Sequence, residues 1–279
     1  LNLKLCADFE HYESPVNYGI ARSMGSAAYM AVSMLLGVWV TKFGVRVIPI
    51  AGLAVTALQG ISNALLARSV VRLRRKMLSG HPAAPPQGRT LAVFLRESPK
   101  FCLLLLGTML LFFAHNTSST FLINVVQHAG GDTTAMGYIS AFLAALEVPT
   151  MLFYSRLFRR KSSAAVLRFS FIFFAVKTAA IAAAPNIPLL FAAEALQVPS
   201  FAIYAPAIVA YVTLVVPYED AAKGQSLAYS MSTVGGVFAS LISGRLFDIL
   251  PVPATMWIAA AVGAAGAVLA CRGLERPKQ

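Results

Sequence analysis

Residues 101–126 read FCLLLLGTMLLFFAHNTSSTFLINVV, and this stretch decides the class of the fold. As a helix rising about 1.5 Å per residue, it is long enough to cross a hydrocarbon core of about 30 Å. Its first half carries no charged group, whereas its second half contains six consecutive polar residues, His115 to Thr120. Six polar residues in a row occupy every side of a helix, so they cannot all face lipid. The stretch therefore predicts a membrane helix whose polar side chains are satisfied inside the protein.

Apolar runs of this length recur along the whole chain. We expect spans at 19–40, 46–67, 101–126, 136–158, 164–184, 187–216, 225–248 and 254–271. The composition agrees, because 58% of the 279 residues are hydrophobic and 12% are charged, whereas a soluble protein carries about 25% charged residues. The sequence therefore predicts an all-α membrane protein with eight transmembrane helices.

One connection between the expected spans is much longer than the others. Residues 68–100 are rich in Lys and Arg and contain the sequence SGHPAAPP at residues 79–86. The other connections are short and carry Gly or Pro as helix breakers. We therefore divide the chain into residues 1–67 with two helices, a basic linker at 68–100, and residues 101–279 with six helices.

Lys and Arg lie almost entirely on one side of the expected membrane. Of the 23 Lys and Arg residues, 17 fall in connections on the side of both termini and the linker, and only Lys42 and Arg46 fall on the other side. Because cytoplasmic loops carry the excess of Lys and Arg, both termini and the linker are predicted to be cytoplasmic. The net charge of +12 is thus a topology signal, and we expect a lipid bilayer and no nucleic acid as the partner.

Four ionisable side chains lie deep within the expected spans: His115, Glu147, Lys177 and Glu194. Each costs on the order of 2.5–3.5 kcal/mol at the bilayer centre, so each needs a partner or a water-filled cavity. Two interpretations of Lys177 and the glutamates stay open, a structural salt bridge between helices or a proton-responsive group. The polar run at 115–120 likewise either bonds neighbouring helices or lines a wet cavity.

The span at 187–216 carries a polar face of its own. Four of its side chains follow i, i+3, i+7 and i+10 spacing, which is one face of a helix: Glu194, Gln197, Phe201 and Tyr204. Pro199 and Pro206 lie in the same span and leave backbone carbonyls that only protein or water can satisfy. The pattern indicates a helix that lines a solute pathway, or a structural kink with a buried glutamate.

The sequence carries no nucleophile triad, phosphate-binding loop or cluster of metal ligands. Its three cysteines, Cys6, Cys102 and Cys271, are far apart and fit no metal or redox spacing. We therefore expect no enzymatic activity, no cofactor and no bound metal.

The sequence YGIARSMGS at residues 18–26 resembles the aromatic-Gly-x-x-Arg-x-x-Gly segment that opens the fifth helix in the lactose permease and phenylpropionate permease branches of the major facilitator superfamily. A basic central linker and six spans follow in the family's order. RLFRRK at residues 156–161 looks like the family's basic cytoplasmic loop without its Asp. The resemblance implies a partial major facilitator fold, with the last two helices of the N-terminal bundle and the six-helix C-terminal bundle. About four N-terminal helices would then be missing, and we expect the chain by itself to be inactive in transport.

The resemblance also implies roles for single residues. Arg22 matches the arginine that binds sugar in the lactose permease branch. Glu147 lies in the eighth-helix region that holds the coupling glutamate, and Lys177 stands where that branch has an arginine. Gln197 and Glu194 stand where it has a histidine and a lysine, so the family's histidine–glutamate couple is not intact here.

These patterns together predict two groups of site residues. The expected solute-binding residues are Arg22, His115, Asn116, Gln197 and Tyr204. The expected proton-coupling residues are Glu147, Lys177 and Glu194. A carboxyl group that loses hydration favours its neutral form, whereas a nearby ammonium group favours its ionised form. Alternation between two such environments would let Glu147 bind and release a proton.

We expect a secondary active transporter of a small solute in the plasma or inner membrane, working as a proton-coupled symporter by alternating access. Efflux of a drug or metabolite by antiport is the alternative among transporters. A non-transporting membrane receptor or scaffold is the alternative of another class, and it would need no charged side chains within the spans.

The predicted topology is tested with single cysteines at Asp132 and Ser79. We expect an impermeant thiol reagent to label Asp132→Cys in intact cells, because the short turn after residue 126 is predicted to face outward. Ser79→Cys, in the linker, should react only after the membrane is opened. The reverse pattern of labelling would overturn the topology.

Overall fold

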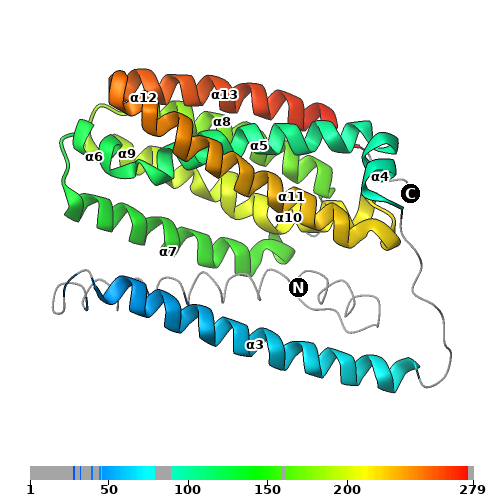
Figure 1. Cartoon of the computed structure of the whole chain (residues 1–279). Coiled ribbons are helices and arrows are strands. Elements are labelled where there is room, and N and C mark those ends of the chain that lie inside the picture. The colour runs from blue at the N-terminus through cyan, green and yellow to red at the C-terminus, as the bar shows by residue number, and fades with distance from the viewer. Residues whose placement is uncertain are drawn as a thin grey trace. The chain divides into compact units, whose positions relative to one another are not determined.

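The structure, a computed structural model, describes residues 46–78, 89–158 and 161–275 together with residues 28, 32, 39 and 44. The regular elements in these ranges are helices, and the described residues contain no strand (Figure 1). The chain divides into two compact units, one of Leu1–Val16 with Met24–Gly88 and the other of Asn17–Ser23 with Arg89–Gln279. The predicted all-α membrane class is confirmed.

In the first unit the structure describes helix α3, Val47–Leu78. Its apolar part, Pro49–Leu65, falls inside the span expected at 46–67. The helix continues beyond that span, so the beginning of the expected linker is helical. Gly44 precedes α3 with a φ of +77°, a left-handed conformation that glycine adopts without strain. The span expected at 19–40 lies outside the described residues except at three positions, and the division of the chain at the linker stays a prediction.

The second unit begins with the short helix α4, Leu91–Glu97. Six helical stretches that are long and apolar enough to cross a membrane follow in its described residues: Pro99–Thr120, Thr133–Tyr154, Ser163–Ala182, Ile187–Val215, Glu219–Ile249 and Val252–Gly273. Each overlaps one of the six spans expected after residue 100. Four of these stretches lie in uninterrupted helices, namely α5 (Pro99–Thr120), α7 (Thr133–Leu157), α8 (Ser163–Ala182) and α13 (Val252–Gly273).

The first of these spans does not continue as one helix to residue 126, as the sequence predicted. Helix α5 covers Pro99–Thr120 and α6 covers Leu122–His128, with Phe121 between them. The hydroxyls of Thr117 and Ser118 donate to carbonyl groups of the same helix. Such local hydrogen bonds compete with the backbone hydrogen bonds of the helix. Helix α5 accordingly ends at Thr120, the last residue of the polar run.

Two other spans are interrupted within their apolar stretches. The first consists of α9 (Ile187–Glu194), the 3-10 helix η1 (Ala195–Gln197), the π-helix η2 (Val198–Ala202) and α10 (Ile203–Val215). The second consists of α11 (Tyr218–Phe238), the π-helix η3 (Ala239–Ser243) and α12 (Gly244–Ile249). Pro199 lies within η2 and Pro206 follows it, and neither can donate a backbone N–H. The prolines therefore explain where the first interruption falls.

Helix α5 is the most buried of the six spans, with 67% of its most apolar stretch inside the protein against 11% for α7. Glycines bring α13 and α11 into close contact with it. A Cβ at Gly107 would lie 2.3 Å from the backbone nitrogen of Ala270, and one at Gly235 would lie 2.4 Å from the carbonyl oxygen of Met109. Figure 1 shows α13 running beside α5. Small residues at such contacts let helices associate by close van der Waals packing. This packing matters because the hydrophobic effect does not drive helix association inside a bilayer.

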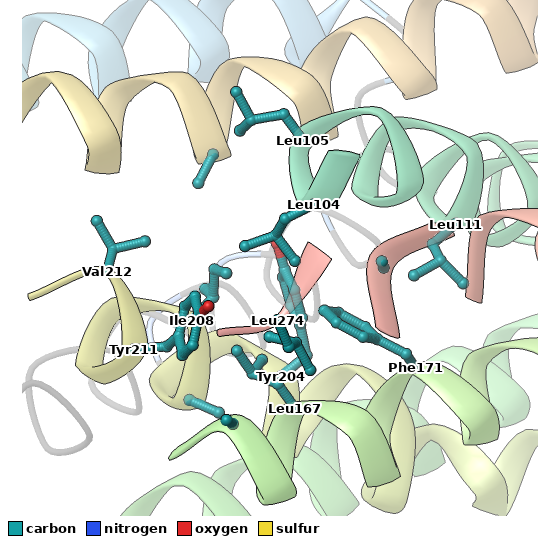
Figure 2. Close-up of a cluster of buried hydrophobic side chains, with 14 of the residues drawn as sticks. Leu104, Leu105, Leu111, Leu167, Phe171, Tyr204, Ile208, Tyr211, Val212 and Leu274 are labelled. Atoms are coloured by element: carbon teal, nitrogen blue, oxygen red, sulfur yellow. The ribbon is translucent and has the colours of Figure 1, made fainter. Parts of the chain in front are cut away.

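Large apolar side chains fill the space between α5, α8 and α10. Figure 2 shows Leu167 and Phe171 of α8, Tyr204 and Ile208 of α10 and Leu104 of α5 in this cluster. Each of the five is less than 5% exposed. A second cluster joins α6, α7, α9 and α13 through Val126, Ile139, Leu190 and Met256.

A cluster of charged side chains joins the chain before α4 to the first turn of α11. Arg89 donates to Asp220 and to Glu97, at 2.7 Å in each case, and Lys223 donates to Asp220 at 2.7 Å. The Asp220 carboxylate accepts from Arg89, which raises the pKa of that guanidinium above its ordinary value. Asp220 also lies at a helix N-terminus, where a negative charge is favourable. The cluster therefore fixes α4 to the rest of the unit.

We expect Gly107→Ala to destabilise the protein by about 3 kcal/mol or more, because its new methyl group would meet backbone atoms of α13. Gly137→Ala is the matched control, since nothing lies within 4 Å of a Cβ at that position. Thermal unfolding of the two purified variants measures the difference. Equal melting temperatures would show that the contact between α5 and α13 tolerates a methyl group.

Candidate functional site

A chain of polar contacts joins four side chains inside the apolar spans. The Lys177 ammonium lies 2.7 Å from Glu194 Oε2 and donates to Gln197 Oε1 at 2.6 Å. Gln197 Nε2 in turn donates to Glu147 Oε1 at 2.7 Å. These contacts connect Glu194, Lys177, Gln197 and Glu147 in that order, and we call the four residues the polar network.

Each member of the polar network is positioned by its own local structure. Glu147 lies in α7, Lys177 lies in α8, and Glu194 ends α9, whereas Gln197 ends the 3-10 helix η1. In a 3-10 helix, residues three apart lie on the same side. The tight turn therefore directs both Glu194 and Gln197 towards Lys177, which confirms the shared face predicted for these two residues.

The two ends of the polar network differ in exposure. The side chains of Lys177 and Glu194 are each 3% exposed. Glu147, at the other end, is half-buried. The network is therefore closed to its surroundings at the Lys177–Glu194 pair and partly open at Glu147.

The polar network holds two carboxyl groups and one ammonium group. Because an ammonium group only donates, the Gln197 oxygen faces Lys177 and its amide N–H groups are left for Glu147. An N–H donated to a carboxylate favours the ionised form, whereas removal from water favours the neutral acid. Lys177 and Glu194 are opposite in charge and in contact, and Glu147 is the second carboxyl group of the network.

His115 lies in an aromatic cluster beside the polar network. Its ring stacks on Phe201, with centroids 5.4 Å apart and planes at 8°, and it meets the edge of Phe174 at 5.5 Å. Phe112 and Tyr204 complete the cluster, with centroids 5.3 Å apart. The ring of His115 is deeply buried, and its Nδ1 has no hydrogen-bond partner among the described residues. We call these five residues the aromatic cluster.

The rest of the polar run at 115–120 divides between local and interhelical bonds. Asn116 Nδ2 donates to a carbonyl of its own helix at 2.7 Å, and the Thr117 hydroxyl lies 2.7 Å from that of Ser243 in η3. Interhelical bonding, one of the two interpretations left open by the sequence, is therefore correct for Thr117. Arg22, also predicted to bind solute, lies outside the described residues.

Most of the chain, including the polar network and the aromatic cluster, matches one protein family. The family model described as the MFS_1 like family covers residues 10–258. The chain belongs to the MFS_1-like family. No curated protein matches it. The match confirms the predicted membership of the major facilitator superfamily and supports an integral membrane transporter rather than an enzyme. The permease branch stays a prediction.

Sequence reasoning missed the face of α8 that supports the site in this MFS_1-like protein. The Ser170 hydroxyl donates to the carbonyl oxygen of Ser200 in η2 at 2.8 Å. Phe174, one turn further along, contacts His115. Ser170, Phe174 and Lys177 follow i, i+4 and i+7 spacing, so all three share one face of the helix. This spacing, counted from Lys177, is the signal that could have found the other two residues.

We expect Lys177→Met and Glu194→Gln each to destabilise the protein by about 3–5 kcal/mol, because either change leaves an uncompensated partner in the interior. The double variant should recover a large part of that loss. A double-mutant cycle in the melting of the purified protein measures the coupling. Arg245→Met with Asp248→Asn is the control cycle, since that exposed pair is 3.9 Å apart and should show a coupling of at most about 1 kcal/mol. Additive losses at Lys177 and Glu194 would contradict the prediction.

Proposed function

We propose that the protein is a proton-coupled secondary transporter of a small solute, in which Glu147 takes up the coupling proton. One observation carries the proposal: two carboxyl groups and one ammonium group share a hydrogen-bonded network inside the apolar spans. A network that only held helices together would be complete with Lys177 and Glu194. The additional carboxyl group gives the network a position at which a proton can be gained and lost.

Glu147 suits the coupling proton better than Glu194 does. Glu194 touches the ammonium of Lys177 directly and is almost fully buried. Glu147 is half-buried and receives the N–H of Gln197. The geometry therefore supports a fixed ion pair at one end and an exchangeable proton at the other, joined by Gln197.

The solute is proposed to bind near the aromatic cluster, at His115, Asn116, Gln197 and Tyr204, and also to contact Arg22, which lies outside the described residues. His115 and Tyr204 belong to the aromatic cluster, and Gln197 to the polar network next to it. Asn116 follows His115 on α5 and is partly buried. We further propose alternating access in a plasma or inner membrane with both termini in the cytoplasm, as the distribution of Lys and Arg favours.

Glu147→Gln tests the proposal. We expect this variant to lose accumulation of solute against a gradient while keeping exchange down a gradient, because its amide cannot take up a proton. Both activities are measured in vesicles that contain the full-length protein. Glu219→Gln is the control, since Glu219 is exposed at the start of α11 and belongs to no part of the network.

Undiminished accumulation by a well-expressed Glu147→Gln protein would overturn the coupling role. The direction of the proton gradient separates symport from antiport. An inward gradient should drive uptake by a symporter. If only an outward gradient drives uptake, the protein is an antiporter, the alternative that fits drug or metabolite efflux.

A further inference from the structure

The hydroxyl of Ser170 bonds across helices and not along its own. Ser170 and Thr178 both lie on α8, and each is at most 2% exposed. The Thr178 hydroxyl donates to the carbonyl of Phe174 in the same helix at 3.0 Å, a common bond for a hydroxyl inside a helix. The Ser170 hydroxyl instead donates to the backbone carbonyl of Ser200, in η2 of another span, at 2.8 Å. This bond ties α8 to the backbone of the interrupted span.

That carbonyl belongs to a stretch with irregular backbone bonds. Pro199 has no N–H, so it cannot give the carbonyl of Ala195 its α-helical bond. The N–H of Val198 donates to this carbonyl instead, which is the 3-10 pattern. The Ser200 hydroxyl donates to the carbonyl of Leu196 at 2.7 Å. Serine hydroxyls therefore bond the backbone at two points of the stretch.

These two points lie on either side of Gln197. Leu196 directly precedes Gln197, and Ser200 follows it by three residues. Lys177 also holds Gln197, but it does so through the side chains of both residues, and a lysine has a flexible four-carbon stem. Two long side chains keep such a contact over a range of backbone positions. The short side chain of Ser170, bonded directly to a carbonyl, leaves the backbone a much smaller range.

The two attachments of the interrupted span to α8 set its position along that helix. Ser170 and Lys177 are seven residues, or about two turns, apart on one face of α8. They hold Ser200 and Gln197 respectively. The amide of Gln197 lies 2.6 Å from Lys177 on α8 and 2.7 Å from Glu147 on α7. Both hydrogen bonds form together only while the backbone at Gln197 keeps its place between the two helices.

We propose that Ser170 is a positioning residue of the polar network. Its bond to the carbonyl of Ser200 holds the backbone at Gln197 where one amide meets both Lys177 and Glu147. Because its hydroxyl donates to the backbone, Ser170 acts on Glu147 through Gln197. The inference rests on the proposed function for the importance of the Glu147 proton, but the positioning is tested without transport of a solute.

The test follows the protonation of Glu147 by infrared spectroscopy in the purified full-length protein. Loss of a band in Glu147→Gln identifies the carbonyl band of the protonated carboxyl group, and the midpoint of its titration is compared among variants. We expect Gln197→Ala to move the midpoint by about one pH unit, because it removes a hydrogen bond to that group. Ser170→Ala should move it in the same direction by about half a unit. In the Gln197→Ala background, Ser170→Ala should cause no further shift.

Thr178→Ala is the matched control, because it removes a similarly buried hydroxyl that bonds to its own helix. It should leave the midpoint of Glu147 unchanged. Lys177 and Glu194, the other charged groups of the polar network, are present in all these variants. A serine with a purely structural role would lower the melting temperature without moving the titration. An unchanged midpoint in Ser170→Ala, or an equal shift in Thr178→Ala, would therefore overturn the proposal.

Melting of the same proteins separates the positioning from the proposed function. The drop in melting temperature caused by Ser170→Ala should shrink in the Gln197→Ala background, because both changes release the same stretch, whereas Thr178→Ala should cost the same in both backgrounds. Additive losses for Ser170→Ala and Gln197→Ala would overturn the positioning. If these two are coupled in melting while Glu147 does not titrate, the proton-coupled function fails and the positioning stands. Loss of accumulation in Glu147→Gln without that coupling would leave the function standing without the positioning.

Discussion

A polar group inside a membrane span cannot hydrogen-bond to water in the hydrocarbon core, so it needs a partner within the protein. The helix contacts in the described part of the second unit follow from this requirement. Lys177 is the clearest case. A lysine on α8 could face lipid only at high cost, so α8 presents it to α9 and η1, where Glu194 and Gln197 meet it. Thr117 shows the same requirement on α5, which pairs it with Ser243. These pairings fix the rotation of α8 and of α5 about their axes.

The interruptions of the helices fall at the same places as the polar contacts. Gln197 ends η1, Ser200 in η2 takes the hydroxyl of Ser170, and Ser243 ends η3. Irregular backbone at membrane depth is tolerated only where protein or water satisfies it. The regular helices α5 and α13 pack by close contact, and the glycines of both helices serve that purpose. The unit thus divides into a part with regular helices around α5 and α13 and a part with irregular backbone around the polar network.

The sequence was sufficient for the parts of the fold that depend on length and hydropathy. The six spans after residue 100, the all-α class and the superfamily could all be predicted from it. The pairing of Lys177 could not, because hydropathy gives the length of a helix and not its rotation or its neighbours. The break at Phe121 was also missed, since a run of polar residues does not show whether its hydroxyls bond their own helix or another one. The roles of Arg22 and of the two expected helices before the linker remain predictions.

The buried ion pair is better explained by what it orients than by the stability it adds. A buried pair of opposite charges often stabilises a protein no more than two apolar residues of the same size would. Lys177 and Glu194 nevertheless do one thing that apolar residues cannot do. The ammonium holds the amide oxygen of Gln197 towards Lys177, which leaves an N–H of the same amide to donate to Glu147. In the proposed transporter, the buried pair therefore orients the amide of Gln197, and that amide in turn contacts Glu147, the carboxyl group proposed to exchange the proton.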